Sequence, residues 1–292
     1  MSAHESQTNI FGQVPPQREL FHYTSAEGLK GIVSGRTLWA TNIEYLNDTT
    51  EFNHGEDVIR EVIASSKHGT KGDRREFFNT LEKKPSIFHA EDLFVISLSE
   101  EGDLLSQWRG YTPSNFGFSI GFDPQSLTEE SQTLDKMELV QCVYDEAEQM
   151  AFAKSLLDSC LEMWIQHLKR DHARESSNRD LGSIISFKVY STFAAAAMKH
   201  RTFAEEREWR LLGLSRDLER TCFRPGKSSL IPYIELKWDK ETKAPQAQPI
   251  TSVTVGPCPN PTLAAKSVSR LLRTCNLGGV QVKKSEIPFK SW

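Results

Sequence analysis

The sequence has few cysteines and no long apolar run, and each of these absences excludes a class of protein. Its five cysteines are widely spaced, and none belongs to a Cys-x-x-Cys pair. An odd and scattered set argues for reduced thiols in the cytoplasm and against a disulfide framework or a structural zinc site. No apolar stretch approaches the length of a membrane span. We therefore expect a cytoplasmic protein with no membrane partner.

Common motifs for phosphate binding and serine catalysis are also missing. The chain has no Gly-rich phosphate loop, no Gly-x-Ser-x-Gly turn and no internal repeat. Residues 224–229 contain Gly and Lys but lack the spacing and the preceding strand of a P-loop, so they are interpreted as a turn before a strand at 230–236. A net charge of −4 argues against a protein that grips nucleic acid with its whole surface.

What is present is an ordinary globular composition. The chain has 292 residues, of which 38% are hydrophobic and 25% are charged, so it can bury a core without disulfides. Residues 1–18 are polar at their start and are expected to form a flexible tail. Residues 19–292 are expected to form a single domain.

Two helices are predicted in the middle of the chain. Apolar residues recur at helical spacing over residues 152–168 and again from residue 184 to 198, and a polar stretch joins the two runs. We expect this pair to form a helical insertion, at about residues 148–200, packed between strands of a sheet.

The most informative motif is Phe-Ala-Glu-Glu-Arg-Glu-Trp-Arg at residues 203–210. Interpreted as the start of a strand, it places Glu206 and Glu208 on one face with Cα atoms about 6.5–7 Å apart. Two close carboxylates suit chemistry through a cationic sugar, because one stabilises the cation while the other orients or deprotonates a nucleophile. The alternative is a charged edge strand whose Glu and Arg side chains pair in water.

A second motif, Phe-His-Tyr-Thr-Ser at residues 21–25, ends a short strand and begins a helix. Thr24 and Glu27 have the spacing of a capping box. His22 and Tyr23 would then lie beside a helix N-terminus, which offers an imidazole, an aromatic ring and free N–H groups to a nucleotide. The structural alternative for His22 is a hydrogen bond to neighbouring backbone.

Further polar and aromatic candidates lie between these two motifs. Asn47, Asp48 and Glu51 follow a brief strand near residue 40, and they suit either ligand contact or capping of the next helix. Two serines share one face of a buried strand at 93–99, and a Trp-x-x-Tyr sequence follows. The candidates are Tyr45, Asn47, Asp48, Glu51, Ser97, Ser99 and Tyr111.

The order of these motifs resembles a known family. From about Phe21 to residue 288 the chain contains His-Tyr-Thr, Asn-Asp-x-x-Glu, Ser-x-Ser, Trp-x-x-Tyr and Phe-x-x-Glu-x-Glu-Trp-Arg. It is similar to the bacterial domain of unknown function family 2971, which resembles a distant branch of the ADP-ribosyltransferase fold. The resemblance implies an α+β fold of two packed, largely antiparallel sheets with NAD as co-substrate in the cleft between them.

The resemblance also implies an NAD-binding role for several candidates. His22 would hydrogen-bond the ribose or the carboxamide of NAD, and Tyr23 or Tyr45 would stack on nicotinamide. Ser97 or Ser99 would support the catalytic glutamate. The predicted NAD site also includes Thr24, Tyr111 and Arg210.

Two glutamates are the catalytic residues that the resemblance implies. Glu208 would contact the 2′-hydroxyl of the nicotinamide ribose and stabilise the oxocarbenium ion, while Glu206 would align the acceptor. Arginine-modifying members of the fold have Ser-Thr-Ser and an Arg at the first motif, whereas this chain has Leu98 and His22 there. These departures argue against a simple arginine-modifying enzyme.

Basic residues crowd around the two glutamates. Such a cluster would suit the pyrophosphate of NAD or a phosphodiester target, and its alternative is a solvated charged face. The cluster consists of Lys199, His200, Arg201, Arg207 and Arg210.

The resemblance implies an NAD-dependent ADP-ribosyltransferase, a toxin or antiphage defence enzyme that modifies nucleic acid or protein. Such an enzyme would have an antitoxin or a chaperone as a partner. Two alternatives stay open: a catalytically silent nucleotide-sensing module, and a hydrolase that uses the same glutamates on NAD with water as acceptor.

Overall fold

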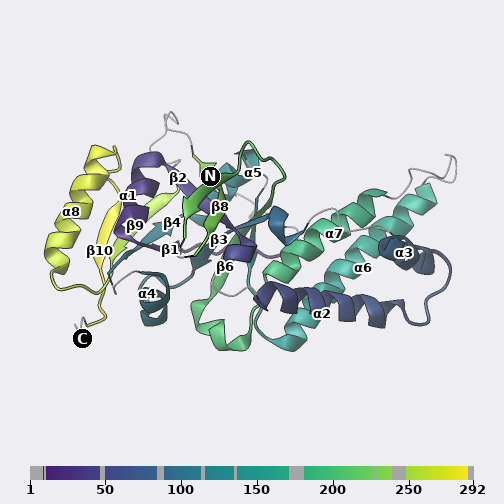
Figure 1. The fold of residues 1–292 in the computed structure, drawn as a ribbon. Coiled ribbons are helices and arrows are strands. Elements are labelled where there is room, and N and C mark those ends of the chain that lie inside the picture. The colour runs from purple at the N-terminus through teal and green to yellow at the C-terminus, as the bar shows by residue number, and fades with distance from the viewer. Residues whose placement is uncertain are drawn as a thin grey trace, which may run out of the picture.

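A branched sheet of ten strands, with helices packed around it, forms the described part of the chain (Figure 1). The computed structural model describes residue 9 and residues 11–46, 50–83, 89–112, 116–134, 137–170, 181–226, 228–238 and 248–288. The strands are β1 (Leu20–Thr24), β2 (Thr37–Asn42), β3 (Leu93–Ser99), β4 (Phe118–Phe122), β5 (Glu138–Gln141), β6 (Glu208–Leu214), β7 (Cys222–Pro225), β8 (Leu230–Lys237), β9 (Ile250–Val255) and β10 (Gln281–Lys284).

The helices fall into two groups, one around the sheet and one beyond its end. They are α1 (Ala26–Gly35), α2 (Thr50–Lys67), α3 (Gly72–Lys83), α4 (Leu105–Tyr111), α5 (Pro124–Leu134), α6 (Glu146–Arg170), α7 (Leu181–Ala196) and α8 (Pro261–Thr274), with short 3-10 helices η1 (Ile43–Tyr45), η2 (Ala90–Asp92) and η4 (Arg201–Glu206). Within the described ranges, each helix is too short or too polar to cross a membrane.

The sheet is continuous and branches at β3. Its main order is β10-β9-β4-β1-β3-β2-β8-β7, and β6 pairs with β3 and with β5. The pairs are antiparallel except for β9 with β10. The prediction of an α+β fold with largely antiparallel strands is confirmed. The prediction of two packed sheets is wrong, because β3 hydrogen-bonds strands from both halves of the structure.

One edge of β3 is shared by β1 and β2, which pair with different parts of it. β2 pairs with Phe94 and Val95, whereas β1 pairs with Ser99. Since β6 occupies the other edge over the whole length of β3, the sheet is split between β1 and β2. At this split the main-chain carbonyl of Ser97 accepts a hydrogen bond from a side chain instead of a strand.

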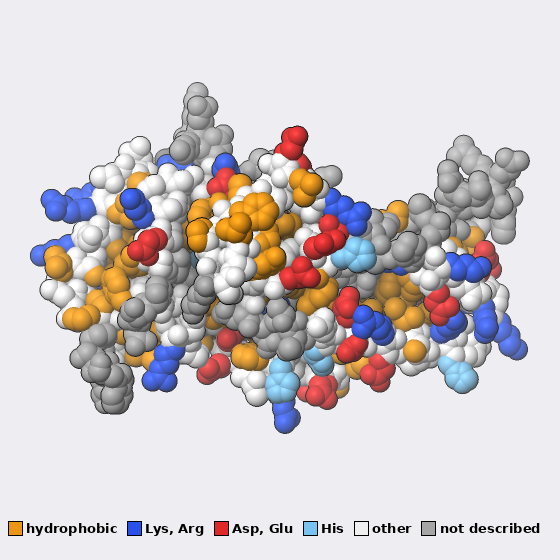
Figure 2. Space-filling view, in the orientation of Figure 1, with side chains coloured by type: hydrophobic (Ala, Val, Ile, Leu, Met, Phe, Trp, Pro, Cys, Tyr) orange, Lys and Arg blue, Asp and Glu red, His pale blue; other side chains and the backbone are white. Residues whose placement is uncertain are grey.

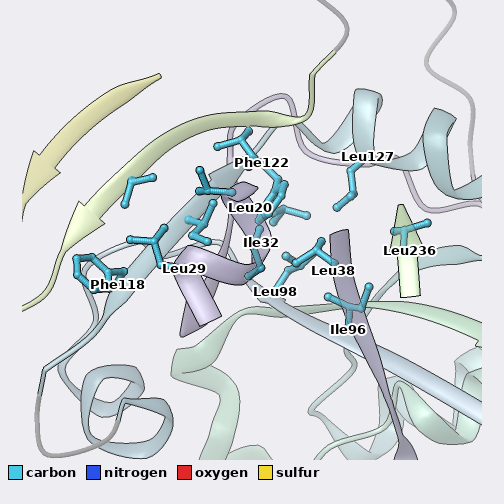
Figure 3. Packing of buried hydrophobic residues seen from close by; sticks show 14 of the residues in the cluster. Leu20, Leu29, Ile32, Leu38, Ile96, Leu98, Phe118, Phe122, Leu127 and Leu236 are labelled. Atoms are coloured by element: carbon cyan, nitrogen blue, oxygen red, sulfur yellow. The ribbon is translucent and has the colours of Figure 1, made fainter. Parts of the chain in front are cut away.

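Side chains on the two faces of β3 enter different cores. Ile96 and Leu98 pack with residues such as Leu20, Leu29 and Leu38 of β1, α1 and β2 (Figure 3). Leu93 and Val95 point the other way and pack against α7. Because strand side chains alternate, Ser97 and Ser99 continue the face of Leu93 and Val95, away from the core that Ile96 and Leu98 enter.

Four helices form a lobe beyond one end of the sheet (Figure 1). This helical lobe consists of α2, α3, α6 and α7, with a core of Phe77, Phe78, Leu157 and Trp164 among others. The two helices predicted in the middle of the chain are confirmed as α6 and α7. They pack against α2 and α3, which come from residues 50–83, so the lobe is built from two separate segments.

The start of α1 lies one residue later than predicted. Thr24 is still paired with Phe118 in β1, so Ser25 is the N-cap and its Oγ accepts a hydrogen bond from the N–H of Gly28 at 3.1 Å. The predicted capping box of Thr24 and Glu27 is therefore wrong, because the sheet ladder holds Thr24 in extended backbone.

The residues just before β1 lie against the sheet and the lobe. Asn9 Nδ2 donates to the carbonyl of Leu139 on β5 at 2.7 Å, and the ring of Phe11 lies 4.8 Å from that of Phe152. Residues 1–8 and 10 of the predicted tail lie outside the described residues.

Candidate active site

A pocket with a volume of about 1020 Å³ lies at the split in the sheet. This volume suits a ligand of dinucleotide size, because pockets for small molecules usually measure about 300–1,000 Å³. Its wall comes from the strands β1, β2, β3, β6, β7 and β8, from the helices α1, α2 and α4, and from the short helices η1 and η4. The ten predicted site residues all lie in this wall: His22, Tyr23, Thr24, Tyr45, Ser97, Ser99, Tyr111, Glu206, Glu208 and Arg210.

His22 closes the split with its side chain. Its Nδ1 lies 3.0 Å from the main-chain oxygen of Ser97, and because a carbonyl only accepts, Nδ1 carries the proton. Burial lowers the pKa of His22, and the nearby charge of Arg224 lowers this pKa further. The ring is therefore neutral, and Nε2 is an acceptor that makes no hydrogen bond to the described residues.

Glu206 and Glu208 meet at the ammonium group of Lys199. Lys199 Nζ lies 2.7 Å from Glu206 Oε2 and 2.7 Å from Glu208 Oε2, and 3.4 Å from Glu51 Oε1. The prediction that both glutamates share one strand face is wrong. Glu206 ends η4, Arg207 has left-handed backbone with φ 42°, and β6 begins only at Glu208. This turn brings the two carboxylates to the same cation.

Arg210 completes a buried ion network. Its Nε donates to Glu208 Oε1 at 2.9 Å, and its Nη2 donates to Glu51 Oε2 at 2.7 Å. The side chains of Arg210 and Lys199 are each 4% exposed. The structure thus places these two members of the predicted phosphate-binding cluster on carboxylates, and exposed Arg207 pairs with Glu101. None of the three is a free cation for a pyrophosphate.

The network shifts the pKa values of its two catalytic candidates in opposite directions. Burial alone would raise the pKa of Glu208, but Arg210 and Lys199 outweigh burial and lower it to about 2. Burial raises the pKa of Glu206, although Lys199 opposes this shift. Environments that separate two carboxyl pKa values in this way give the groups different roles. Glu208 is a permanent anion, and Glu206 is suited to exchange a proton.

The three tyrosines of the pocket wall differ in availability. Tyr23 donates its hydroxyl proton to the carbonyl of Glu101 at 2.7 Å, and its ring packs edge-on against Trp108. Tyr23 thus has a packing role, and stacking of Tyr23 or Tyr45 on nicotinamide stays a prediction. Tyr45 and Tyr111 are 41% and 40% exposed. Burial and the two glutamates raise the pKa of Tyr111 to about 12, so its hydroxyl stays a donor.

Ser99 fixes the backbone that carries Glu206. Its Oγ donates to the main-chain carbonyl of Glu206 at 2.7 Å and accepts from the N–H of Glu101 at 3.0 Å. In the ladder of β3 with β6, Ser99 lies opposite Glu208 and Ser97 lies opposite Arg210. The Ser-x-Ser motif thus lies directly beside the ion network.

Support for Lys199 comes from the helical lobe and was missed by sequence reasoning. Gln149 Nε2 donates to the carbonyls of Val143 and Lys199, both at 2.9 Å. Gln149 Oε1 lies 2.9 Å from His54 Nε2, which must carry the proton because an amide oxygen only accepts. A glutamine near the start of a helix gives no sequence signal for this role.

Glu51 joins the network because α2 passes very close to the end of α7. A Cβ atom on Gly55 would lie 2.2 Å from the main-chain oxygen of Ala195, so only glycine allows this approach. Glu51 lies one helical turn before Gly55. Of the three residues predicted to cap a helix or contact ligand, Glu51 joins the network, and Asn47 and Asp48 lie outside the described residues.

The other end of the pocket contains residues that the sequence did not single out. Arg224 and Pro225 lie in β7, so the turn predicted at residues 224–229 is wrong at its first two positions. Arg224 Nη2 donates to Thr41 Oγ1 at 2.9 Å. Trp39 of β2 stacks on Tyr233 of β8 with ring centroids 4.4 Å apart. Among the described residues, no cluster of His, Cys, Asp or Glu is placed to hold a metal ion.

Comparison with protein families matches one part of the chain. The model described as "Protein of unknown function (DUF2971)" matches residues 107–211. The predicted family is confirmed over these residues. The DUF2971 match includes Tyr111, Lys199, Glu206, Glu208 and Arg210. Comparisons with curated proteins and with solved structures gave no match.

Proposed function

We propose that this chain is an NAD-dependent ADP-ribosyltransferase. The observation that carries the proposal is the meeting of Glu206 and Glu208 at Lys199 in the pocket wall, with their pKa values shifted in opposite directions. Cleavage of the bond between nicotinamide and ribose leaves positive charge on the ribose. A fixed anion and a carboxyl group that exchanges a proton are the two groups that such a reaction needs.

Glu208 supplies the fixed anion. A carboxylate has about four lone-pair positions, and three of them accept hydrogen bonds, from Lys199 Nζ at 2.7 Å and from Arg210 Nε and Nη2 at 2.9 and 3.2 Å. One position remains on Oε1 for a ribose hydroxyl. The ion network contains three carboxylates and two cations, so a negative charge is left to stabilise a cationic ribose.

Glu206 is the proton acceptor in this proposal. Its Oε2 binds Lys199, and its Oε1 accepts no hydrogen bond from the part of the chain that the structure describes. The bond between C1′ and nicotinamide breaks, and its electron pair leaves with nicotinamide. The acceptor then forms a bond to C1′ and gives its proton to Glu206. The acceptor in our proposal is a nucleic acid or a protein, as in a toxin or defence enzyme.

His22, Tyr45 and Tyr111 would hold NAD in the pocket. The unprotonated Nε2 of His22 accepts a hydrogen bond from a ribose hydroxyl or from the carboxamide N–H group. Tyr45 offers an exposed ring for stacking, and Tyr111 offers a hydroxyl donor close to the two glutamates.

A second candidate function is a nucleotide-sensing module without turnover. This function is favoured by the surroundings of Glu208. Its side chain is buried, and each of its two oxygens binds a cation. Such pairing reduces the electrostatic stabilisation that the carboxylate gives to a cationic ribose. A module of this kind binds NAD and leaves it intact.

Product analysis separates these functions. The protein is incubated with NAD and with total RNA, DNA or lysate protein, and the products are measured by mass spectrometry. A transferase releases nicotinamide and adds ADP-ribose to an acceptor, whereas a hydrolase releases nicotinamide and free ADP-ribose. Intact NAD together with measurable NAD binding would favour the sensing module over the transferase.

A further inference from the structure

Arg224 differs from the other two cations of the pocket wall. Lys199 and Arg210 are paired with carboxylates, but Arg224 forms no ion pair with any described residue. A guanidinium has five N–H donors, and within the described residues that of Arg224 makes one hydrogen bond, from Nη2 to Thr41 Oγ1. Its Nε is shielded from solvent and has no hydrogen-bond partner in the part of the chain that the structure describes. The unused N–H donors on the two Nη atoms of this cation suit an anion.

Trp39 places an aromatic ring next to this cation. The Cζ atom of Arg224 lies 5.9 Å from the centre of the Trp39 ring. Trp39 is held by its stacking on Tyr233, yet it is 40% exposed. The alternation of β2 explains its position, because Leu38 and Ala40 enter the core while Trp39 lines the pocket. Figure 2 shows hydrophobic side chains gathered over the region of β8, the strand beside β2.

We propose that Arg224 and Trp39 form a subsite for the nucleoside diphosphate part of the ligand. The guanidinium binds phosphate oxygens through paired hydrogen bonds, and the indole stacks on the base. The identification of the ligand as NAD rests on the proposed function, whereas the subsite itself is defined for any nucleoside diphosphate.

The charges of the pocket then set the direction of a bound dinucleotide. The excess carboxylate of the ion network repels phosphate and attracts the cationic nicotinamide ring. Arg224 attracts the pyrophosphate. NAD therefore binds with its nicotinamide end at Glu208 and its adenylate end at Trp39, with His22 between them, close enough for Arg224 to affect its pKa.

Calorimetric titration with ADP and with adenosine tests the subsite without requiring catalysis. The wild-type protein should bind ADP at least about tenfold more tightly than adenosine, because only ADP has phosphates for Arg224. Arg224→Gln should abolish this preference and leave adenosine binding unchanged. Trp39→Ala should weaken both ligands by about tenfold, because both have the base.

Two further variants control for charge and folding. Arg60→Gln removes a surface arginine of α2 that pairs with Glu56 and Asp57 outside the pocket wall, and it should bind ADP as the wild type does. Arg224→Lys keeps the charge but loses the paired donors, so its ADP affinity should lie between those of the wild type and Arg224→Gln. It replaces Arg224→Gln if circular dichroism shows that the latter does not fold.

The subsite is overturned if folded Arg224→Gln binds ADP as tightly as the wild type, or if the wild type does not prefer ADP to adenosine. Nicotinamide release is measured on the same samples. Loss of ADP binding in Arg224→Gln without nicotinamide release by the wild type would support the subsite and contradict the proposed function. Nicotinamide release that depends on Glu208, together with unchanged ADP affinity in Arg224→Gln, would support the proposed function and contradict the subsite.

Discussion

The imidazole of His22 donates a hydrogen bond from Nδ1 to the main-chain carbonyl of Ser97 at 3.0 Å. This contact bridges the gap that β1 and β2 leave on one edge of β3. Both predicted alternatives for His22 are therefore compatible. One ring nitrogen donates to a main-chain carbonyl of the sheet, and the other is left for the pocket. In our proposal, the structural role belongs to Nδ1 and the ligand role to Nε2 of the same side chain.

Replacement of His22 by Asn separates these two roles. The amide nitrogen of Asn takes the position of Nδ1 and keeps the bond to Ser97, but nothing replaces Nε2. We expect His22→Asn to unfold in urea with a free energy within about 0.5 kcal/mol of the wild type and to bind NAD about tenfold more weakly. His22→Ala should additionally lose about 0.5–1.5 kcal/mol. Unchanged NAD affinity in both variants, with a large stability loss in His22→Ala, would favour a structural role alone.

The lowered pKa of His22 predicts a loss of stability in acid. The ordinary value is 6.5 and the folded value is lower, so below about pH 6.5 the unfolded chain binds a proton that the folded protein does not. The free energy of unfolding should then fall by up to about 1.4 kcal/mol per pH unit until the folded-state pKa is reached. His22→Asn should lack this component between pH 7 and 5. A constant difference between the two proteins over this range would contradict the burial of a neutral imidazole.

The ion network predicts that a second substitution, Glu208→Gln, restores part of the stability that Lys199→Met removes. Lys199→Met leaves three carboxylates with the single cation of Arg210 and should cost about 3–5 kcal/mol. Adding Glu208→Gln restores the original excess of one carboxylate, so the double variant should be more stable than Lys199→Met alone. Urea unfolding of the two single variants and the double variant measures the coupling. Additive losses would show that Lys199 and Glu208 do not share one network.

The close approach of α2 to α7 predicts a large effect of one methyl group. A Cβ on Gly55 would lie 2.2 Å from the oxygen of Ala195, so Gly55→Ala should cost about 1–3 kcal/mol and displace Glu51 from Arg210. Gly182→Ala in α7 is the matched control, because a Cβ there has no neighbour within 4 Å. That change should be neutral or stabilise by up to about 1 kcal/mol. Equal melting temperatures for the two variants would contradict this description.

Local sequence patterns predicted the parts of the site that lie on regular elements. His22 and Tyr23 at the end of β1, Ser97 and Ser99 on one face of β3 and Glu208 at the start of β6 all follow from strand alternation. The helices α6 and α7 follow from their apolar periodicity. The residues on β1, β3 and β6 reach the pocket wall because these strands are neighbours in the sheet.

The rest of the site could not be predicted from the sequence, because it depends on contacts between segments that are far apart in the chain. Nothing in the run Met198-Lys199-His200 distinguishes a surface lysine from one buried among three carboxylates, because Glu51 comes from another part of the chain. The left-handed backbone of Arg207 breaks the alternation that placed Glu206 on the strand. Arg224 is positioned by the pairing of β7 with β8, which itself pairs with β2, and its neighbours in sequence do not indicate this.

The most direct test of the proposed function is nicotinamide release from NAD by the wild type, Glu208→Gln and Glu205→Gln. Glu205 is an exposed carboxylate of the same turn and controls for the loss of one negative charge. All samples are first checked by circular dichroism, because Glu208 is part of a buried network. We predict that Glu208→Gln releases nicotinamide at least about 10²-fold more slowly than the wild type, and that Glu205→Gln does not. Release by folded Glu208→Gln at the wild-type rate would contradict the assignment of Glu208 as the catalytic anion.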